Sequence, residues 1–227
     1  MDAARTPARR APGRPRTADA LSLDDILLAA LRAFADRGYD GTSVRELNAQ
    51  LGGSHNLIGE RIGRKEDLWR AVVDRFVGES TESIIAMARG ASSEPAASPA
   101  DRLAALRDVW IELVVANARR PELLRMMTVE ASTDGPRLDE LYERFVRPTA
   151  TAMGELYGSL VADGVLRALP AASLFFLLAH GATGPSSHAP LAAKLGVPDA
   201  TDPVWVQRHA TAVVDALLSG IRIDGAR

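Results

Sequence analysis

Residues 34–47 read FADRGYDGTSVREL and residues 51–69 read LGGSHNLIGERIGRKEDLW. Ser43 followed by Glu46 has the spacing of a capping box, in which a hydroxyl and a carboxylate bond the free backbone N–H groups at a helix start. The Gly52-Gly53 pair is typical of a helix end, because glycine readily adopts the left-handed conformation that closes a helix. The stretch therefore predicts a helix that begins near Ser43 and stops at the two glycines.

A shorter helix is predicted directly after these glycines, over residues 54–61 with Ser54 as its cap. Before both, a capping box at Ser22 and an apolar stripe predict a helix over residues 22–38. Two helices joined by a tight glycine-containing turn, behind a first helix, are the parts of a helix-turn-helix. We place this motif at about residues 43–60.

The rest of the sequence also predicts helices. A longer helix with Leu68, Trp69 and Val72 in its apolar stripe follows Gly63. Proline or capping residues open further segments near positions 98, 121, 136, 170 and 203, each with apolar residues at helical spacing, and no alternating strand pattern occurs. Residues 181–202 are rich in Gly and Pro and predict a loop. We therefore expect an all-α protein of about nine helices.

Composition divides the chain into three parts. Residues 1–20 are rich in Pro, Ala and Arg and predict a flexible basic arm, residues 21–70 hold the helix-turn-helix, and residues 71–227 predict a larger helical domain. Residues 1–75 carry 13 Lys and Arg against 11 Asp and Glu, whereas the remainder carries 14 against 18. The N-terminal part is thus the more basic one, as phosphate binding requires.

Several function classes find no support in the sequence. Cysteine is absent, which excludes disulfides and cysteine catalysis and is compatible with a cytoplasmic location. The four histidines show no metal-ligand spacing, and no phosphate-binding loop or nucleophile elbow occurs. No apolar run reaches the roughly 18 residues of a membrane span. We expect no metal, no cofactor, no membrane contact and no enzyme activity.

The two quoted segments resemble the DNA-binding domain of the tetracycline-repressor family. The resemblance covers about residues 22–75 and implies a homodimer that binds a double-stranded DNA operator and responds to a small-molecule effector. It also implies pairing through the last two helices. Here these are segment 171–182 and helix 203–219, both apolar over more than one face. The matching residues are Phe34, Ala35, Gly38, Tyr39, Thr42, Ser43, Val44, Leu47, Gly52, Ser54, Ile58, Lys65, Glu66 and Leu68.

The predicted DNA contacts come from the helix-turn-helix and the arm. His55 and Asn56 are the candidates for base edges, since asparagine can pair bidentately with adenine. Leu57 is expected either at a thymine methyl or in the core, and Lys65 resembles the family's phosphate-binding lysine. The arm either enters an AT-rich minor groove or is held loosely by charge. The full set is Arg14, Arg16, Thr42, Ser43, Arg45, Ser54, His55, Asn56, Leu57, Arg61 and Lys65.

Two glycines depart from the family pattern. Gly59 stands where the family often has an aromatic residue that contacts a phosphate, and Gly53 stands where a hydrophobic residue is usual. They leave open an alternative, a family member with weakened sequence-specific DNA binding that acts as a ligand- or protein-binding module.

A further prediction concerns the effector. Methionine and aromatic residues lie on the helices that line the ligand cavity in the family, although such residues are more often ordinary core. The candidate pocket residues are Trp110, Met126, Met127, Tyr142, Phe145, Met153 and Tyr157.

Overall fold

The computed structural model describes residues 21–52, 54–93, 97–197 and 199–223. All of its regular elements over these ranges are helices, apart from one isolated bridge between Leu166 and Arg222. The predicted all-α class is therefore confirmed. Within the described ranges, no helix is long and apolar enough to cross a membrane.

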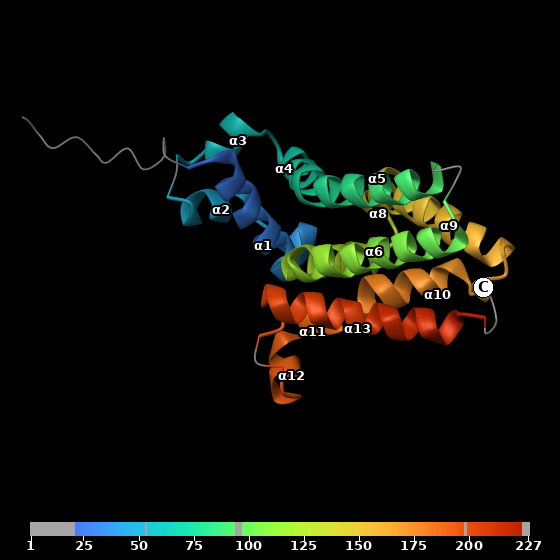
Figure 1. Ribbon diagram of the computed structural model, residues 1–227. Helices are drawn as coiled ribbons and strands as arrows, with labels where there is room; N and C mark the ends of the chain where they lie inside the picture. The colour runs from blue at the N-terminus through green and yellow to red at the C-terminus, as the bar shows by residue number, and fades with distance from the viewer. Residues whose placement is uncertain (1–20, 53, 94–96, 198, 224–227) are drawn as a thin grey trace, which may run out of the picture.

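The N-terminal domain is built from four helices, which lie together at one end of the molecule (Figure 1). They are α1 (Leu23–Gly41), α2 (Val44–Gln50), α3 (Leu57–Arg61) and α4 (Lys65–Val73). The capping box predicted at the start of α1 is present. Gly38 interrupts α1 with a φ of 70°, and one more helical turn follows the break. The predicted end of this helix is thus a sharp break.

Longer helices form the second domain. Two π-helical turns join neighbouring α-helices, so that α4 and α5 are one continuous rod, as are α8 and α9, and a third extends α10. The predicted boundary at residues 70–71 therefore falls inside a helix. The elements are η2 (Asp74–Gly78), α5 (Glu79–Ser93), α6 (Pro99–Ala118), α7 (Pro121–Ala131), α8 (Pro136–Leu141), η3 (Tyr142–Val146), α9 (Arg147–Ala162), α10 (Ala171–Phe176), η4 (Leu177–Gly181), α11 (Gly184–Ser187), α12 (Ala189–Lys194) and α13 (Pro203–Ile221).

The structure corrects the expected helix count. The described residues form eleven continuous helical segments, whereas about nine were expected. The two additional ones, α11 and α12, lie in residues 181–202, where the sequence predicted only a loop. They span four and six residues, which is too short for a helical period to stand out among glycines and prolines.

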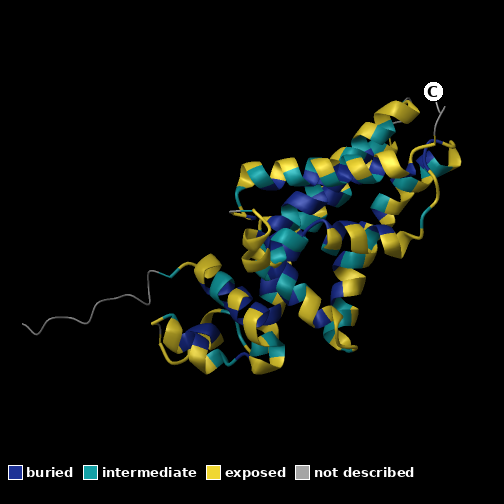
Figure 2. Ribbon diagram, turned by 90° about the horizontal axis from the view of Figure 1, so that it is seen from below, coloured by how far each residue is buried: buried dark blue, intermediate teal, exposed yellow. Residues whose placement is uncertain are grey.

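Buried side chains form two hydrophobic cores, and the buried faces of the helices point inward in both (Figure 2). The first core joins Phe34 and Trp69 of the small domain to Met126 and Phe145 of the large one. The second lies among α5, α6, α9, α10 and α13, around Trp110. Because α7 and η3 contribute to the first core, the helix-turn-helix is packed directly onto the large domain.

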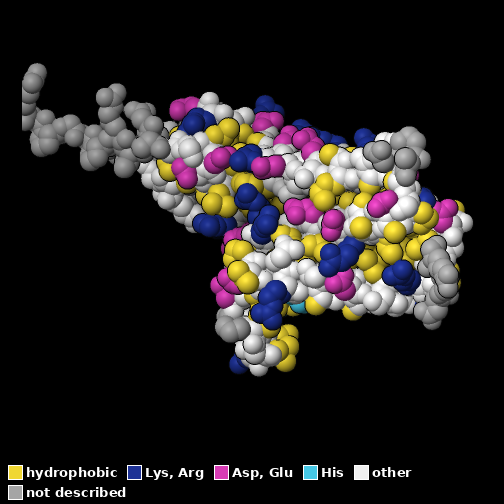
Figure 3. All heavy atoms as spheres, viewed as in Figure 1, with side chains coloured by type: hydrophobic (Ala, Val, Ile, Leu, Met, Phe, Trp, Pro, Cys, Tyr) yellow, Lys and Arg dark blue, Asp and Glu magenta, His cyan; other side chains and the backbone are white. Residues whose placement is uncertain are grey.

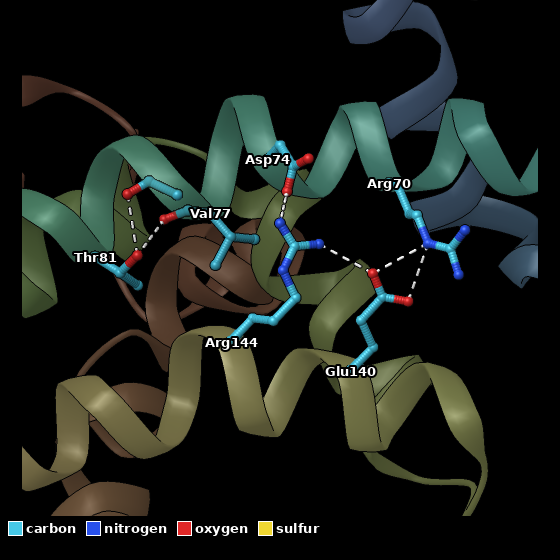
Figure 4. A network of polar contacts seen from close by, with 7 residues as sticks. Arg70, Asp74, Val77, Thr81, Glu140 and Arg144 are labelled. Atoms are coloured by element: carbon cyan, nitrogen blue, oxygen red, sulfur yellow. Dashed lines mark hydrogen bonds and ion pairs between the residues drawn. The ribbon is translucent and has the colours of Figure 1, made fainter.

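Ion pairs reinforce this junction along α4. Arg70 donates to both carboxylate oxygens of Glu140 on α8, at 3.1 and 3.2 Å, and Arg144 donates to Glu140 at 2.9 Å and also to Asp74 (Figure 4). The Glu140 carboxylate raises the pKa of Arg70 above its usual range. Glu140 and Arg144 thus join two turns of the α4–η2 rod to α8 and η3.

Truncation of Trp110 should destabilise the protein strongly. Its side chain is 1% exposed and its ring lies 6.1 Å from that of Tyr157, so Trp110→Ala leaves a large cavity in the second core. We expect a loss of about 3–5 kcal/mol in the free energy of unfolding. Urea denaturation followed by circular dichroism measures this loss. Met87→Ala, on an exposed side chain, is the control, and equal losses in the two variants would contradict the assignment.

Candidate nucleic-acid interface

Thr42 fixes the corner between α1 and α2. Its side chain is buried, and its hydroxyl lies 3.1 Å from the Ala33 carbonyl and 2.7 Å from the Gly38 carbonyl, both of which it can donate to. The hydroxyl has one hydrogen, which either carbonyl near the end of α1 can accept. Thr42 was predicted to contact DNA, but the structure places its hydroxyl inside the corner.

Ser43 caps α2 as predicted. Its hydroxyl accepts a hydrogen bond from the Glu46 N–H at 3.3 Å. The second half of the expected capping box is not formed, because the Glu46 carboxylate pairs with Arg37 on α1 at 3.3 Å. Ser43 is half-buried at the N-terminus of α2, whose free N–H groups carry the partial positive charge that attracts phosphate.

Asn48 joins the two helices of the motif. Its side chain is 4% exposed. The amide nitrogen donates to the His55 carbonyl at 3.0 Å, and the amide oxygen accepts from the Ile58 N–H at 3.0 Å. One buried side chain on α2 therefore holds the turn and caps the first backbone groups of α3. Sequence reasoning missed this residue; its only signal was a polar side chain next to Leu47 in the apolar stripe.

The third helix starts later than the sequence predicted. It begins at Leu57, and the Leu57 N–H bonds the Ser54 carbonyl, so Ser54 does not cap the helix with its hydroxyl. Ser54, His55 and Asn56 form an exposed turn in front of the helix. Leu57 is 5% exposed and belongs to the core, which decides between its two predicted roles. The candidate base-reading residues thus project from a turn that Asn48 fixes.

The structure gives Gly59 a local reason. A Cβ at position 59 would lie 2.2 Å from the side-chain oxygen of Asn56, one turn earlier. A side chain at position 59 would therefore displace the exposed Asn56 amide from its present position. Gly53 lies outside the described residues, as do Arg14 and Arg16 of the predicted arm.

Each helix of the motif, and α4 after it, contributes a basic side chain. Arg45 and Arg61 are exposed, and Arg61 donates to the Leu21 carbonyl at 2.5 Å. The Lys65 ammonium donates to the Asp40 carbonyl at 3.3 Å and lies 4.5 Å from the centre of the Tyr39 ring. These three charges come from α2, α3 and α4, the helices of the motif and the one that follows it.

Tyr39 links this surface to the large domain. Its ring stacks on Phe34 at 5.9 Å, and the guanidinium of Arg137 on α8 lies 4.1 Å from its centre. Arg137 also donates to the buried Glu130 at 2.8 Å. Burial, followed by the charge of Glu66, raises the pKa of the Tyr39 hydroxyl above its usual value. The aromatic ring is therefore shared between Lys65 of the interface and Arg137 of the large domain.

The seven candidate pocket residues fall into separate places. Trp110 is buried in the second core, against which Met153 and Tyr157 pack. Met126 and Phe145 belong to the first core, and Met127 packs against it. Tyr142 is exposed. Their role as a ligand pocket stays a prediction, because the effector is not part of the structure.

The short helix α3 follows an exposed turn that is hydrogen-bonded to α2. This arrangement is that of a helix-turn-helix protein. Residues 26–72 match the family model described as bacterial regulatory proteins, tetR family. The match covers the four N-terminal helices, the part of the chain in which the sequence resembles this family.

Two curated relatives are similar to part of the chain. The chain is 35% identical over 63 residues to the HTH-type transcriptional repressor AcnR of Corynebacterium efficiens, and 32% identical over 79 residues to AcnR of Corynebacterium glutamicum. The alignments cover 28% and 33% of this chain, and they span 34% and 42% of the relatives. The chain thus covers less than half of the length of either relative.

Solved structures extend the likeness to the whole fold. PfmR, a TetR family transcriptional regulator from Thermus thermophilus, matches with a TM-score of 0.57 at 19% identity, over 89% of this chain and 98% of that one. A tetR-family regulatory protein from Rhodococcus matches with a TM-score of 0.58 at 20% identity, over 93% and 100%. At this identity, the matches show a shared fold.

Asn48→Ala should loosen the helix-turn-helix. The substitution leaves the His55 carbonyl and the Ile58 N–H without their partner, which costs about 1–3 kcal/mol of stability. Chemical denaturation measures the loss, and amide hydrogen exchange at Ile58 should accelerate. Gln50→Ala, on the exposed side of the same helix, is the matched control. Unchanged protection at Ile58 would show that Asn48 does not hold α3.

Proposed function

We propose that this protein is a homodimeric transcription regulator that binds double-stranded DNA operators and represses transcription. One observation carries the proposal: the exposed turn with His55 and Asn56 is held by Asn48 at the N-terminus of a short helix. That is the end at which such helices meet base edges in the major groove. The names of the Corynebacterium relatives favour repression, and binding to chromosomal DNA implies a cytoplasmic location.

In this proposal the interface residues have two kinds of role. His55 and Asn56 read base edges, while Ser43, Arg45, Arg61 and Lys65 hold phosphates. Lys65 is already positioned by the Asp40 carbonyl and the Tyr39 ring, which reduces the side-chain freedom that it would lose on binding.

A dimer is part of the proposal, formed through the predicted segment 171–182 and helix 203–219. Phe176 and Leu177 are exposed on the first, and Ala212 and Ala216 on the second. Small residues on one helix allow a second helix to approach closely, and exposed aromatic and aliphatic side chains can fill such a contact. Two reading heads related by twofold symmetry then match half-sites about 34–36 Å apart.

A small-molecule effector completes the proposed function. The larger domain has a hollow of about 420 Å³ between α6 and α13, bordered by Leu103, Arg107, Val165, Asp215 and Arg222. Its volume lies in the range of small-molecule sites. Two contacts join the large domain to the helix-turn-helix: the ion pair of Arg70 with Glu140, and the guanidinium of Arg137 on the Tyr39 ring. A change in the large domain would reach the helix-turn-helix through them.

Selection of bound DNA from a random pool tests the operator proposal. We expect one enriched palindromic sequence whose affinity falls steeply with salt, because phosphate binding releases counterions. Absence of any salt-sensitive DNA binding would refute the proposed function. A wild-type protein that sediments as a monomer at micromolar concentration would refute the dimer.

Two substitutions separate phosphate contacts from base contacts. Lys65→Ala should weaken binding to all sequences about equally and reduce the salt slope by about 1. Asn56→Ala should relax the preference at particular operator bases, where a bidentate contact contributes about 1–3 kcal/mol. Fluorescence anisotropy on the selected operator and its single-base variants measures both effects. Arg89→Ala, an exposed charge on α5, is the control, and variants that behave alike would contradict the division of roles.

A further inference from the structure

Residues 171–197 have an unusual composition and surface. Charged residues make up 25% of the chain, yet Lys194 is the one Asp, Glu, Lys or Arg in these 27 positions. Ten large hydrophobic side chains are exposed among the described residues, and five of them lie between residues 176 and 204. Depletion of charge together with exposed apolar side chains is the composition of a protein interface core.

The helices α11 and α12 form a projecting arm within this region. In Figure 1, α13 is the lowest helix of the large domain and α12 projects beneath it; Figure 3 shows hydrophobic side chains on the same projection. The base of the arm is fixed by buried hydroxyl groups: Thr183 donates to the Ala179 carbonyl and Ser186 to the Ala200 carbonyl, each at 2.7 Å. These hydrogen bonds fix the position of the arm on the large domain.

On α12 the alanine at position 192 is buried, whereas Ala189, Ala193 and the leucine at position 191 are exposed. Ala192 and Ala200 are 4% and 2% exposed, whereas Leu191 and Leu195 are 56% and 76% exposed. Burial of a leucine side chain is normally favourable. Leu191 and Leu195 therefore contribute to stability only when another surface covers them. An isolated chain leaves that apolar area in water.

We propose that the α11–α12 arm clasps a second copy of this chain, with Leu191 and Leu195 buried against the partner subunit. This inference rests on the proposed dimer and adds a contact outside the pairing of segment 171–182 with helix 203–219. The arm projects from the side on which α13 is outermost. A copy docked there meets both the leucines and a face that carries the small residues Ala212 and Ala216.

The surfaces are complementary in the way that a twofold dimer requires. Each subunit presents both a bulky apolar projection and a helix with small outward residues, so the same contact forms twice across the axis. The uncharged stretch runs without interruption from α10 into the arm, which makes the arm a continuation of the proposed dimer face.

Sedimentation equilibrium of Leu195→Asp and of the double variant Leu191→Asp/Leu195→Asp tests the clasp. A buried carboxylate in place of each leucine should raise the dimer dissociation constant by about tenfold or more. Met87→Asp, an exposed apolar side chain on α5, is the matched control and should leave the constant unchanged. Circular dichroism verifies that each variant is folded.

Cross-linking provides a second measurement on the folded dimer. Because the chain has no cysteine, Leu195→Cys creates a unique attachment point for a benzophenone maleimide. We expect intersubunit cross-links after illumination, and none from Met87→Cys. A wild-type monomer would refute the proposed dimer itself. A wild-type dimer whose affinity is unchanged in both aspartate variants, with cross-links only inside one chain, would refute the clasp and leave the dimer standing.

Discussion

The buried amide of Asn48 satisfies a carbonyl in the turn and an N–H at the start of α3, and the geometry of the whole interface depends on these two hydrogen bonds. A five-residue helix has too few internal hydrogen bonds to be stable by itself. Its position must therefore come from outside, through this amide and through the burial of Leu57 and Ile58. The exposed turn then has a fixed orientation, which is what a base-reading surface needs.

The same principle operates at the other helix ends of the small domain. Thr42 donates to a carbonyl near the break in α1, and Ser43 satisfies an N–H at the start of α2. The first N–H and the last C=O groups of a helix have no partner within that helix. Their hydrogen bonds to Thr42 and Ser43 set the angles between successive helices. Two residues expected at the DNA surface thus contribute to the shape of the domain, one of them from a fully buried position.

The small domain is also not independent of the large one. The rod of α4, η2 and α5 passes between them without interruption, and both domains contribute to the first core. Glu140 holds Arg70 on this rod, and Arg137 lies over the Tyr39 ring that also contacts Lys65. A displacement of α8 would therefore move Glu140 and Arg137, and with them their partners Arg70 and Tyr39.

Local patterns in the sequence determined the helical class, the caps at Ser22, Ser43 and Ser98, and the place of the helix-turn-helix, because capping and periodicity act over three to seven residues. Tertiary structure decided the features that depend on distant partners. The late start of α3, the burial of Leu57 and the space that Gly59 leaves for Asn56 follow from contacts with α2 and within the folded turn. The candidate pocket residues shared a composition but were distributed over two cores, since helical spacing places a side chain on a face without determining which helix covers it. Likewise, the outward leucines of α12 are visible only once the arm is folded, because burial is a property of the whole chain.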